Sequence, residues 1–270
     1  MVKKTVIITG GGRGIGKYLA QRFATEYNVV LASRSLNEIN NTLDEIKNIG
    51  GDGIAIQTDV SNFEQVKNLI SQTIQTFQKI DVLINNAGMI TPIGPINTID
   101  ANAWTKTLQI NLFGTFYCTQ LVSSHMISQN YGKIINLSGG GAFNPFPNFS
   151  AYSTSKAAIV RFTETVAKEL SKHHIDVNAI APGAMKTKIM YDVVSSGDMA
   201  GEELSRAKKI VEEGGSSLEK VGNLALFLAS KESDGLNGKT ISAKWDDLDY
   251  IKSNLEKIQN SDKFTMKRID

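Results

Sequence analysis

Apolar residues follow two alternating patterns along this chain. Short unbroken runs, such as Val29-Val-Leu and Val82-Leu-Ile, are typical of strands that are buried on both faces of a sheet. The stretches between these runs carry apolar residues at helical spacing. Strands are therefore expected near residues 4–9, 28–33, 53–58, 81–85, 132–137, 175–180 and 238–242. The alternation predicts an α/β fold, a doubly wound parallel sheet of about seven strands with helices on both faces.

Composition sets the boundaries of this prediction. The 270 residues, 41% of them hydrophobic, can bury the core of a single domain. No run approaches the length of a membrane span, and the opening Met1-Val-Lys-Lys does not have the pattern of a secretory signal. The single cysteine, Cys118, suits a reducing cytoplasm, where we expect the protein. A net charge of +2 with interspersed signs predicts no nucleic-acid partner, and the histidine spacing predicts no metal site.

The first strand leads into a glycine-rich turn and then into a helix that begins near Gly14. The turn reads Thr9-Gly10-x-x-x-Gly14-Ile15-Gly16. Glycine lets a phosphate approach the amides at the helix N-terminus, where the helix dipole favours negative charge. The spacing differs from the G-x-G-x-x-G fingerprint, and a glycine cluster can also be an ordinary tight turn. Its place between a strand and a helix favours a dinucleotide pyrophosphate.

Tyr152 and Lys156 lie four residues apart in a stretch that is expected to be helical to about Lys172. This spacing puts the phenol and the ammonium on one helix face. An ammonium about 4 Å away favours the phenolate by on the order of 4 kcal/mol at an effective dielectric near 20. Such a tyrosine can exchange a proton near neutral pH. The pair alone can equally be a half-buried ring beside a solvated amine.

Together these segments resemble the short-chain dehydrogenase/reductase family, from about Lys3 to Ile241. Three further motifs carry the resemblance in the family's order: Asn85-Asn86-Ala87-Gly88, Asn111 in Leu108-Gln-Ile-Asn, and Pro182-Gly183-Ala-Met-Lys-Thr187. Each motif is common, whereas five in this order are specific. The resemblance implies a single Rossmann-type domain that binds a nicotinamide dinucleotide and interconverts an alcohol and a carbonyl.

The resemblance also assigns roles to these residues. Tyr152 is expected to exchange a proton with the substrate oxygen, and Lys156 to lower the pKa of the phenol and hold the nicotinamide ribose. Asn111 is expected to position a water that relays protons outward. The Pro182-Gly183 turn and Thr187 are expected to orient the nicotinamide carboxamide.

The end of the second strand indicates which cofactor binds. No Asp or Glu stands there to bind a ribose 2′-hydroxyl; Ser33 and Arg34 take its place. Arg34, with Arg13 from the glycine turn, could pair with a 2′-phosphate, which favours NADP(H) over NAD(H). Asp59 resembles the family's adenine contact but could instead cap the helix that begins near Asn62. The expected cofactor-binding residues are Gly10, Arg13, Gly14, Ile15, Gly16, Ser33, Arg34, Asp59, Val60, Asn86, Ala87, Gly88, Tyr152, Lys156, Pro182, Gly183 and Thr187.

One catalytic position departs from the family. The family's substrate-polarising serine stands thirteen residues before the tyrosine, where this chain has Gly139. The nearby hydroxyl is that of Ser138, and neighbouring strand residues point to opposite faces. Either the following glycines let the turn rewind until Ser138 faces the substrate, which is the interpretation we adopt, or Ser138 is structural and another donor acts.

The resemblance also suggests how the chain is divided. Residues 1–245 are expected to form the dinucleotide-binding domain, in which the irregular segment 186–216 resembles the family's mobile substrate cover. Residues 246–270 are expected to form a helical extension that is apolar through Ile258, followed by a charged tail. Trp245, at this boundary, either packs or closes a pocket of its own or a neighbouring subunit. The Phe143, Phe146 and Phe149 side chains either line a pocket or pack their loop.

The sequence therefore predicts an NADP(H)-dependent oxidoreductase. A binding protein on the same scaffold is the alternative that the missing serine raises, although such a protein has no need of Tyr152, Lys156 and Asn111. A sugar-nucleotide epimerase fits poorly with so short a chain. The resemblance implies a homodimer or homotetramer without a membrane partner. A polar or anionic small-molecule substrate is suggested by Asn144, Asn148, Lys186 and Lys188.

Overall fold

The fold is built on one sheet of seven parallel strands, in a computed structural model that describes residues 3–267. The strand order is β3-β2-β1-β4-β5-β6-β7, so the chain winds outward in both directions from the centre of the sheet. The strand boundaries fall within two residues of the expected positions. The strands are β1 (Lys4–Thr9), β2 (Tyr27–Ser33), β3 (Asp52–Gln57), β4 (Val82–Asn85), β5 (Gly132–Leu137), β6 (Ile175–Ala181) and β7 (Thr240–Ser242).

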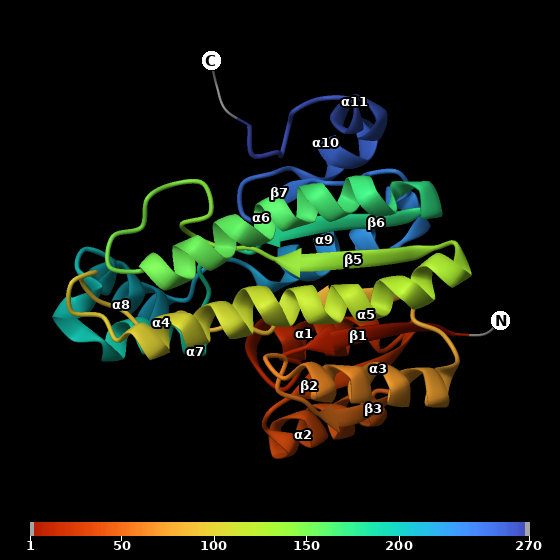
Figure 1. Cartoon of the computed structure of the whole chain (residues 1–270), viewed down its shortest axis with the longest axis horizontal. Helices are drawn as coiled ribbons and strands as arrows, with labels where there is room; N and C mark the ends of the chain where they lie inside the picture. The colour runs from red at the N-terminus through yellow and green to blue at the C-terminus, as the bar shows by residue number, and fades with distance from the viewer. Residues whose placement is uncertain (1–2, 268–270) are drawn as a thin grey trace.

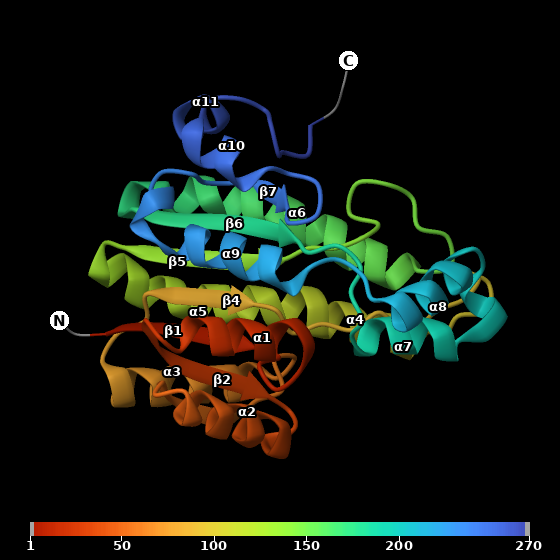
Figure 2. The same cartoon turned by 180° about the vertical axis from the view of Figure 1, so that it is seen from behind.

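Helices cover both faces of the sheet, as a doubly wound fold requires (Figures 1 and 2). Helices α3, α5 and α6 lie in front of the sheet in Figure 1, and α1, α2 and α9 lie in front of it in Figure 2. The helices of the described chain are α1 (Gly14–Phe23), α2 (Leu36–Asn48), α3 (Phe63–Phe77), α4 (Ala101–Leu108), η1 (Gln109–Phe113), α5 (Gly114–Gln129), α6 (Ser150–Leu170), η2 (Ser171–His173), α7 (Lys188–Ser195), η3 (Gly197–Ala200), α8 (Glu203–Glu213), α9 (Leu218–Ala229), η4 (Lys231–Ser233), α10 (Leu248–Ser253) and α11 (Leu255–Gln259).

Two apolar cores hold these layers together, one on each face of the sheet. Alternate residues of a strand enter different cores: on β5, Ile134 packs with Val122 of α5, whereas Ile135 packs in the cluster that contains Leu224 of α9. This is why the strands read as unbroken apolar runs in the sequence. The carboxyl ends of the strands point toward α4, α7 and α8, at the left of Figure 1. Ligands of doubly wound sheets bind at that end.

The segment 186–216 is mostly helical rather than irregular, because it contains α7 and α8. Its short helices bury small and branched side chains, Val193, Ala200 and Ala207, in a third cluster. The same cluster contains Phe149 and Tyr152 at the start of α6. This segment is therefore packed over the carboxyl end of the sheet. Its mobility stays a prediction.

The C-terminal extension forms two short helices, α10 and α11. Ile251 and Ile258, one from each, are completely buried in the core that also contains Leu224. The chain then returns along the sheet edge, where the Thr240 amide donates to the Phe264 carbonyl at 2.8 Å. The last three residues of the predicted tail, 268–270, lie outside the described part of the chain.

Candidate active site

The glycine turn is held against the end of β4 by Asn86. The Asn86 side-chain amide donates to the carbonyls of Thr9 and Gly10, at 2.9 and 3.2 Å. The Thr9 hydroxyl accepts the Asn86 and Ala87 amides, both at 3.1 Å. At Gly16 an added Cβ would lie 2.1 Å from the Gly10 carbonyl oxygen, so only glycine permits this close approach. Thr9 was not among the residues expected in the site, although it belongs to the motif.

The turn ends at an α1 N-terminus that is suited to an anion. Arg13 occupies the N-cap position and makes no side-chain cap hydrogen bond. The first amides of α1 therefore have no side-chain cap among the described residues, and Gly12, Gly14 and Ile15 of this turn line a cavity. This cavity of about 390 Å³ contains most of the expected cofactor residues: Gly10, Arg13, Gly14, Ile15, Ser33, Arg34, Asp59, Val60, Asn86, Ala87, Gly88 and Thr187. Its glycine turn and its helix terminus fit a dinucleotide.

Two arginines lie at the β2 end of this groove, in different states. Arg13 is paired with Glu38 at 3.1 Å, a carboxylate that sequence reasoning missed. Arg34 is exposed and has no ion pair within residues 3–267. Arg34 therefore offers an unpaired guanidinium to an anionic ligand in this groove. The Lys106 ammonium, which also lines the groove and has no ion pair in the described range, donates to the Ser61 hydroxyl at 2.9 Å.

Asp59 does not cap the following helix, because Asn62 does: its side chain accepts the Gln65 amide of α3 at 3.1 Å. The Asp59 carboxylate instead accepts the amide and hydroxyl of Ser61, at 2.9 and 2.6 Å. Burial opposes ionisation, but these hydrogen bonds outweigh it, and with Lys106 and Arg34 they lower the pKa of Asp59. Asp59 is thus a fixed anion on the groove wall.

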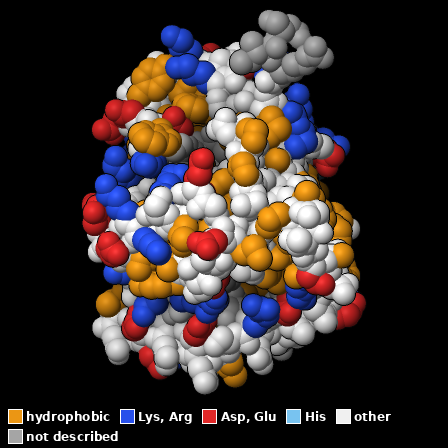
Figure 3. All heavy atoms as spheres, turned by 90° about the vertical axis from the view of Figure 1, so that its left-hand side faces the viewer, with side chains coloured by type: hydrophobic (Ala, Val, Ile, Leu, Met, Phe, Trp, Pro, Cys, Tyr) orange, Lys and Arg blue, Asp and Glu red, His pale blue; other side chains and the backbone are white. Residues whose placement is uncertain are grey.

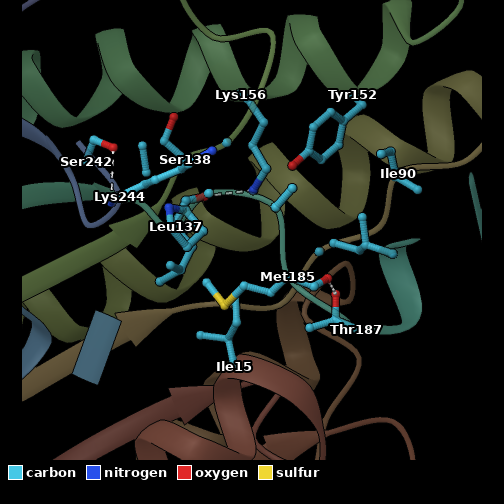
Figure 4. Close-up of a pocket in the computed structure, with 18 of the residues that line it drawn as sticks. Ile15, Ile90, Leu137, Ser138, Tyr152, Lys156, Met185, Thr187, Ser242 and Lys244 are labelled. Atoms are coloured by element: carbon cyan, nitrogen blue, oxygen red, sulfur yellow. Dashed lines mark hydrogen bonds between the residues drawn. The ribbon is translucent and has the colours of Figure 1, made fainter. Parts of the chain in front are cut away.

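Tyr152 and Lys156 lie one helical turn apart on α6 and face the carboxyl ends of the strands. The Lys156 ammonium donates to the Leu137 carbonyl at 2.7 Å and lies 5.6 Å from the centre of the Tyr152 ring (Figure 4). Both side chains are buried. Burial raises the pKa of Tyr152 to about 12 and lowers the pKa of Lys156 to about 8. Without a ligand, burial therefore outweighs the effect of the ammonium on the phenol.

Asn111 lies in the π-helical turn η1, between α4 and α5. Its side chain accepts the Met89 amide at 2.9 Å and donates to the Met89 carbonyl and the Ser155 hydroxyl, at 2.9 and 3.0 Å. Such turns are frequent at functional sites. Asn111 thus fixes the backbone beyond Gly88, and Gly88 leaves a gap between Asn111 and Lys156: an added Cβ would lie 3.3 Å from the Asn111 oxygen and 3.8 Å from the Lys156 ammonium.

Ser138 is not brought to Tyr152. Its hydroxyl is buried without a hydrogen-bond partner, and Figure 4 shows it directed away from the Tyr152 hydroxyl. The backbone of the next residue faces the tyrosine instead, since an added Cβ on Gly139 would clash with the phenol oxygen, 2.3 Å away. The turn has therefore not rewound as we expected, because the Ser138 amide, just past β5, still donates to the Ile180 carbonyl of β6 at 2.9 Å and continues the strand pairing.

A second cavity, of about 450 Å³, lies above the reacting groups, and Ile15, Asn86, Gly88 and Thr187 line it jointly with the cofactor groove. Pro182 and Gly183 also line it. Its other walls are largely apolar and include residues that sequence reasoning missed: Ile90, Met185, Met190 and Ile210. Ile189, also missed, lines both this cavity and the cofactor groove. Phe143 and Phe146 line it too. Phe149 does not line it but stacks on Phe146, with 4.2 Å between the two ring centres.

None of the four residues that suggested a polar substrate lines this second cavity, which excludes Asn144, Asn148, Lys186 and Lys188 from its walls. Lys188 instead pairs with Asp192 on α7. Within residues 3–267, no cluster of three or more His, Cys, Asp or Glu side chains could hold a metal ion. No helix of that range is long and apolar enough to cross a membrane.

Known proteins are similar to this chain in sequence and in architecture. A family model of short chain dehydrogenases matches residues 4–196. The chain is 38% identical over 189 residues to a 3-oxoacyl-[acyl-carrier-protein] reductase of Synechocystis sp., which covers 69% of this chain and 76% of that protein. The chain therefore belongs to the short-chain dehydrogenase family, and its fold is the Rossmann type that the resemblance implied.

Solved structures of other proteins have the same fold. An NAD+-bound xylitol dehydrogenase superposes with a TM-score of 0.82 at 27% identity, covering 88% of this chain and 96% of its own. YwfH, an NADPH-dependent reductase involved in bacilysin biosynthesis, superposes with a TM-score of 0.80 at 26% identity, covering 90% and 97%. These two relatives differ in the cofactor that their descriptions name.

Proposed function

We propose that this protein is an NADP(H)-dependent oxidoreductase that interconverts an alcohol and a carbonyl. The observation that carries the proposal is the position of Tyr152 and Lys156: both line the cavity that continues into the dinucleotide groove. A bound nicotinamide would supply or accept the hydride at this junction. The chain's own residues then have to hold the substrate oxygen and exchange one proton with it.

Tyr152 is the proton donor in the direction of carbonyl reduction. With its pKa raised to about 12, the phenol is protonated at neutral pH and can donate to a carbonyl oxygen. Lys156 stands beside it with an ammonium that remains charged below about pH 8. That charge stabilises a developing phenolate and can bind the nicotinamide ribose. Asn111, next to the gap at Gly88, is placed to hold a relaying water.

NADP(H) is favoured because Arg34 is unpaired at the β2 end of the groove. Arg13 contributes less, since Glu38 already neutralises it. The relatives support a nicotinamide dinucleotide in general, and the choice of NADP(H) rests on Arg34.

A homodimer or homotetramer is proposed from the resemblance. It is supported by an aromatic surface on α3, η1 and α5, where half-exposed Phe63, Phe113 and Phe116 surround Tyr117. Single-domain proteins seldom expose such a cluster without a partner. A cytoplasmic location is likewise proposed, from the single cysteine.

Replacing Tyr152 with phenylalanine separates this enzyme from a dinucleotide-binding protein. The variant keeps the ring but loses the proton, so it should bind NADPH like the wild type and lose nearly all carbonyl reduction. NADPH binding is measured by fluorescence titration, and turnover by NADPH oxidation with a panel of aldehydes, ketones and sugars. If neither protein oxidises NADPH with any of them while both bind it, the binding protein is the better description. Wild-type turnover in the variant would refute the role of Tyr152.

A further inference from the structure

The second cavity extends well beyond the reacting groups. Figure 4 shows Ser242 and Lys244 at the opposite end from Tyr152 and Ile90, with Ser138 and Lys156 between them. Lys244, Trp245 and Asp246, which follow β7, line this far end. Figure 3 views the molecule toward the carboxyl ends of the strands, and hydrophobic, basic and acidic side chains flank a hollow there. The proposed chemistry uses none of these three residues.

The turn at this far end has a fixed backbone. The Ser242 hydroxyl oxygen accepts the amides of Lys244 and Trp245, at 3.3 and 3.2 Å. The Asp246 carboxylate accepts the Ser242 amide at 2.7 Å, and the Ala243 amide donates to the Ala181 carbonyl of β6 at 3.0 Å. The turn is thus tied to the end of the sheet. Yet it presents Trp245 with 77% of its surface exposed, the largest exposed fraction among the large hydrophobic side chains of the described chain.

Lys244 is the free cation of this end of the cavity. Its ammonium lies 4.2 Å from the centre of the Trp245 ring, a cation–π contact that leaves its hydrogens available to an anion. It forms no ion pair within residues 3–267. Arg206, which lines the same cavity, is paired with Glu203 at 3.3 Å.

Between the two ends the cavity offers apolar surface. Met185, Met190 and Ile210 line it, and so do Phe143 and Phe146 of the loop that precedes α6. A substrate that reaches from Tyr152 to Lys244 must therefore pass an apolar wall and finish beside a cation. Ile15, Asn86, Gly88, Thr187 and Ile189 line both this cavity and the cofactor groove, so the substrate and the cofactor would meet there.

We propose that Lys244 and Trp245 form a distal subsite that binds the carboxylate of an elongated keto or hydroxy acid, with its carbonyl or alcohol at Tyr152 and an apolar chain between. The proposal rests on the proposed function and names its substrate class. The Trp245 ring packs against the end of the chain, and the Lys244 ammonium binds the carboxylate. The fixed turn sets the distance between the two ends, so the subsite selects chain length as well as charge.

Kinetics with keto acids of increasing length and their methyl esters test the proposal. In the wild type, kcat/KM should favour the acid over its ester only when the chain is long enough to reach Lys244. Lys244→Met should lower the acid-to-ester ratio roughly tenfold for those long substrates, the effect of losing one charge-assisted hydrogen bond. Lys244→Arg should restore much of it. Lys220→Met is the matched control, because Lys220 lines a neighbouring cavity but not this one; its ratio should equal the wild-type ratio.

Fluorescence provides a readout that needs no turnover. The chain has two tryptophans, and Trp104 is half-buried with its indole donating to Ser150, so Trp104→Phe leaves Trp245 as the only one. Long keto acids should protect Trp245 from acrylamide quenching, and short ones should not. Equal ratios for acids and esters at every length, or equal quenching with and without a long keto acid, would overturn the subsite. Protection without any NADPH oxidation would instead uphold the subsite and count against the proposed oxidoreductase.

Discussion

A Cβ atom on Gly139 would lie 2.3 Å from the hydroxyl oxygen of Tyr152 and 3.3 Å from its Cζ atom. The phenol therefore occupies space that any other residue at position 139 would need. In the family arrangement that the sequence resembles, a serine stands at this position and shares the substrate oxygen with the tyrosine. Here the tyrosine approaches the backbone itself, so position 139 supplies no hydroxyl beside that of Tyr152.

Gly139→Ala should therefore lower kcat strongly, although it adds only one methyl group. The added methyl group must push the phenol away, and a displacement of about 1 Å can cost about 10²-fold in kcat. Gly140→Ala is the matched control, since no heavy atom lies within 4 Å of its added Cβ. Its kcat should remain within about threefold of the wild type. Steady-state reduction kinetics check both variants, and the same loss in each would assign the effect to the loop instead of the Tyr152 contact.

Gly139→Ser tests whether the position of Tyr152 in this structure is the catalytically competent one. If the present geometry is the working one, serine should lower kcat at least as much as alanine. A gain in kcat would mean that the tyrosine can retreat and that the family's pair of hydroxyls is the better catalyst in this chain too.

Ser138→Ala should have little effect on kcat, less than about threefold. The hydroxyl faces away from Tyr152 and has no partner to lose, whereas removal of an oxyanion-type donor costs about 10²–10³. NADPH affinity and the free energy of unfolding should also change little, because no hydrogen bond breaks. A hundredfold fall in kcat would show that Ser138 turns toward the substrate during the reaction, which is the role first expected from the sequence.

The NADP(H) preference predicts different effects for the two arginines of the groove. Arg34→Ala should weaken NADPH binding by about 1.5 kcal/mol, roughly tenfold, the lower end for hydrogen bonds to charged groups because the side chain is exposed. NADH binding should hardly change. Arg13→Ala should weaken NADPH binding less than Arg34→Ala does, since Arg13 is already paired with Glu38. Fluorescence titrations measure the affinity for both cofactors. Equal losses of affinity for NADPH and NADH in Arg34→Ala would count against a 2′-phosphate contact.

The sequence predicted the sheet well because buried parallel strands leave an unmistakable apolar run. The run at Val82 and the glycine turn at Gly10 are local signals, and each strand was placed within two residues. The direction of a single side chain at a strand end is not such a signal. Ser138 and Gly139 differ by one residue, and only the packing of α6 against β5 decides which of them meets Tyr152.

Residues that join the site from far along the chain were also missed for a physical reason. Ile189, Ile210 and Glu38 have no motif of their own, and they reach the site because α7, α8 and α2 pack at the same edge of the sheet. The four polar residues near 144–148 and 186–188 seemed close to the substrate in sequence, yet none lines the second cavity. Sequence proximity to a motif therefore predicted the cofactor groove better than the substrate walls.

The C-terminal extension should contribute to stability. Ile258 is completely buried in the core beneath α9, so Ile258→Ala should lower the free energy of unfolding by about 2–5 kcal/mol. Lys257→Ala, one residue earlier and exposed, is the control and should stay within about 0.5 kcal/mol of the wild type. Urea unfolding measures both. Equal midpoints for the two variants would show that the extension is not part of the cooperative core.

The pKa of Lys156 predicts a pH limit for cofactor binding. Burial lowers this pKa to about 8, so the ammonium is present below pH 8 and is lost as the pH rises above it. If the ammonium holds the nicotinamide ribose, the NADPH dissociation constant should be constant between about pH 7 and 7.5 and should rise above pH 8. The 2′-phosphate does not interfere, because its second proton is lost near pH 6.

Lys156→Met has no ammonium at any pH, so it should bind NADPH more weakly and with a dissociation constant that is flat over the same range. Tyr152→Phe is the control, since it keeps Lys156 and should reproduce the wild-type pH profile. Fluorescence titration from pH 7 to 9.5 gives all three curves. A wild-type dissociation constant that does not change across this range, or a Lys156→Met curve that rises in parallel with it, would show that the ammonium plays no part in binding the cofactor.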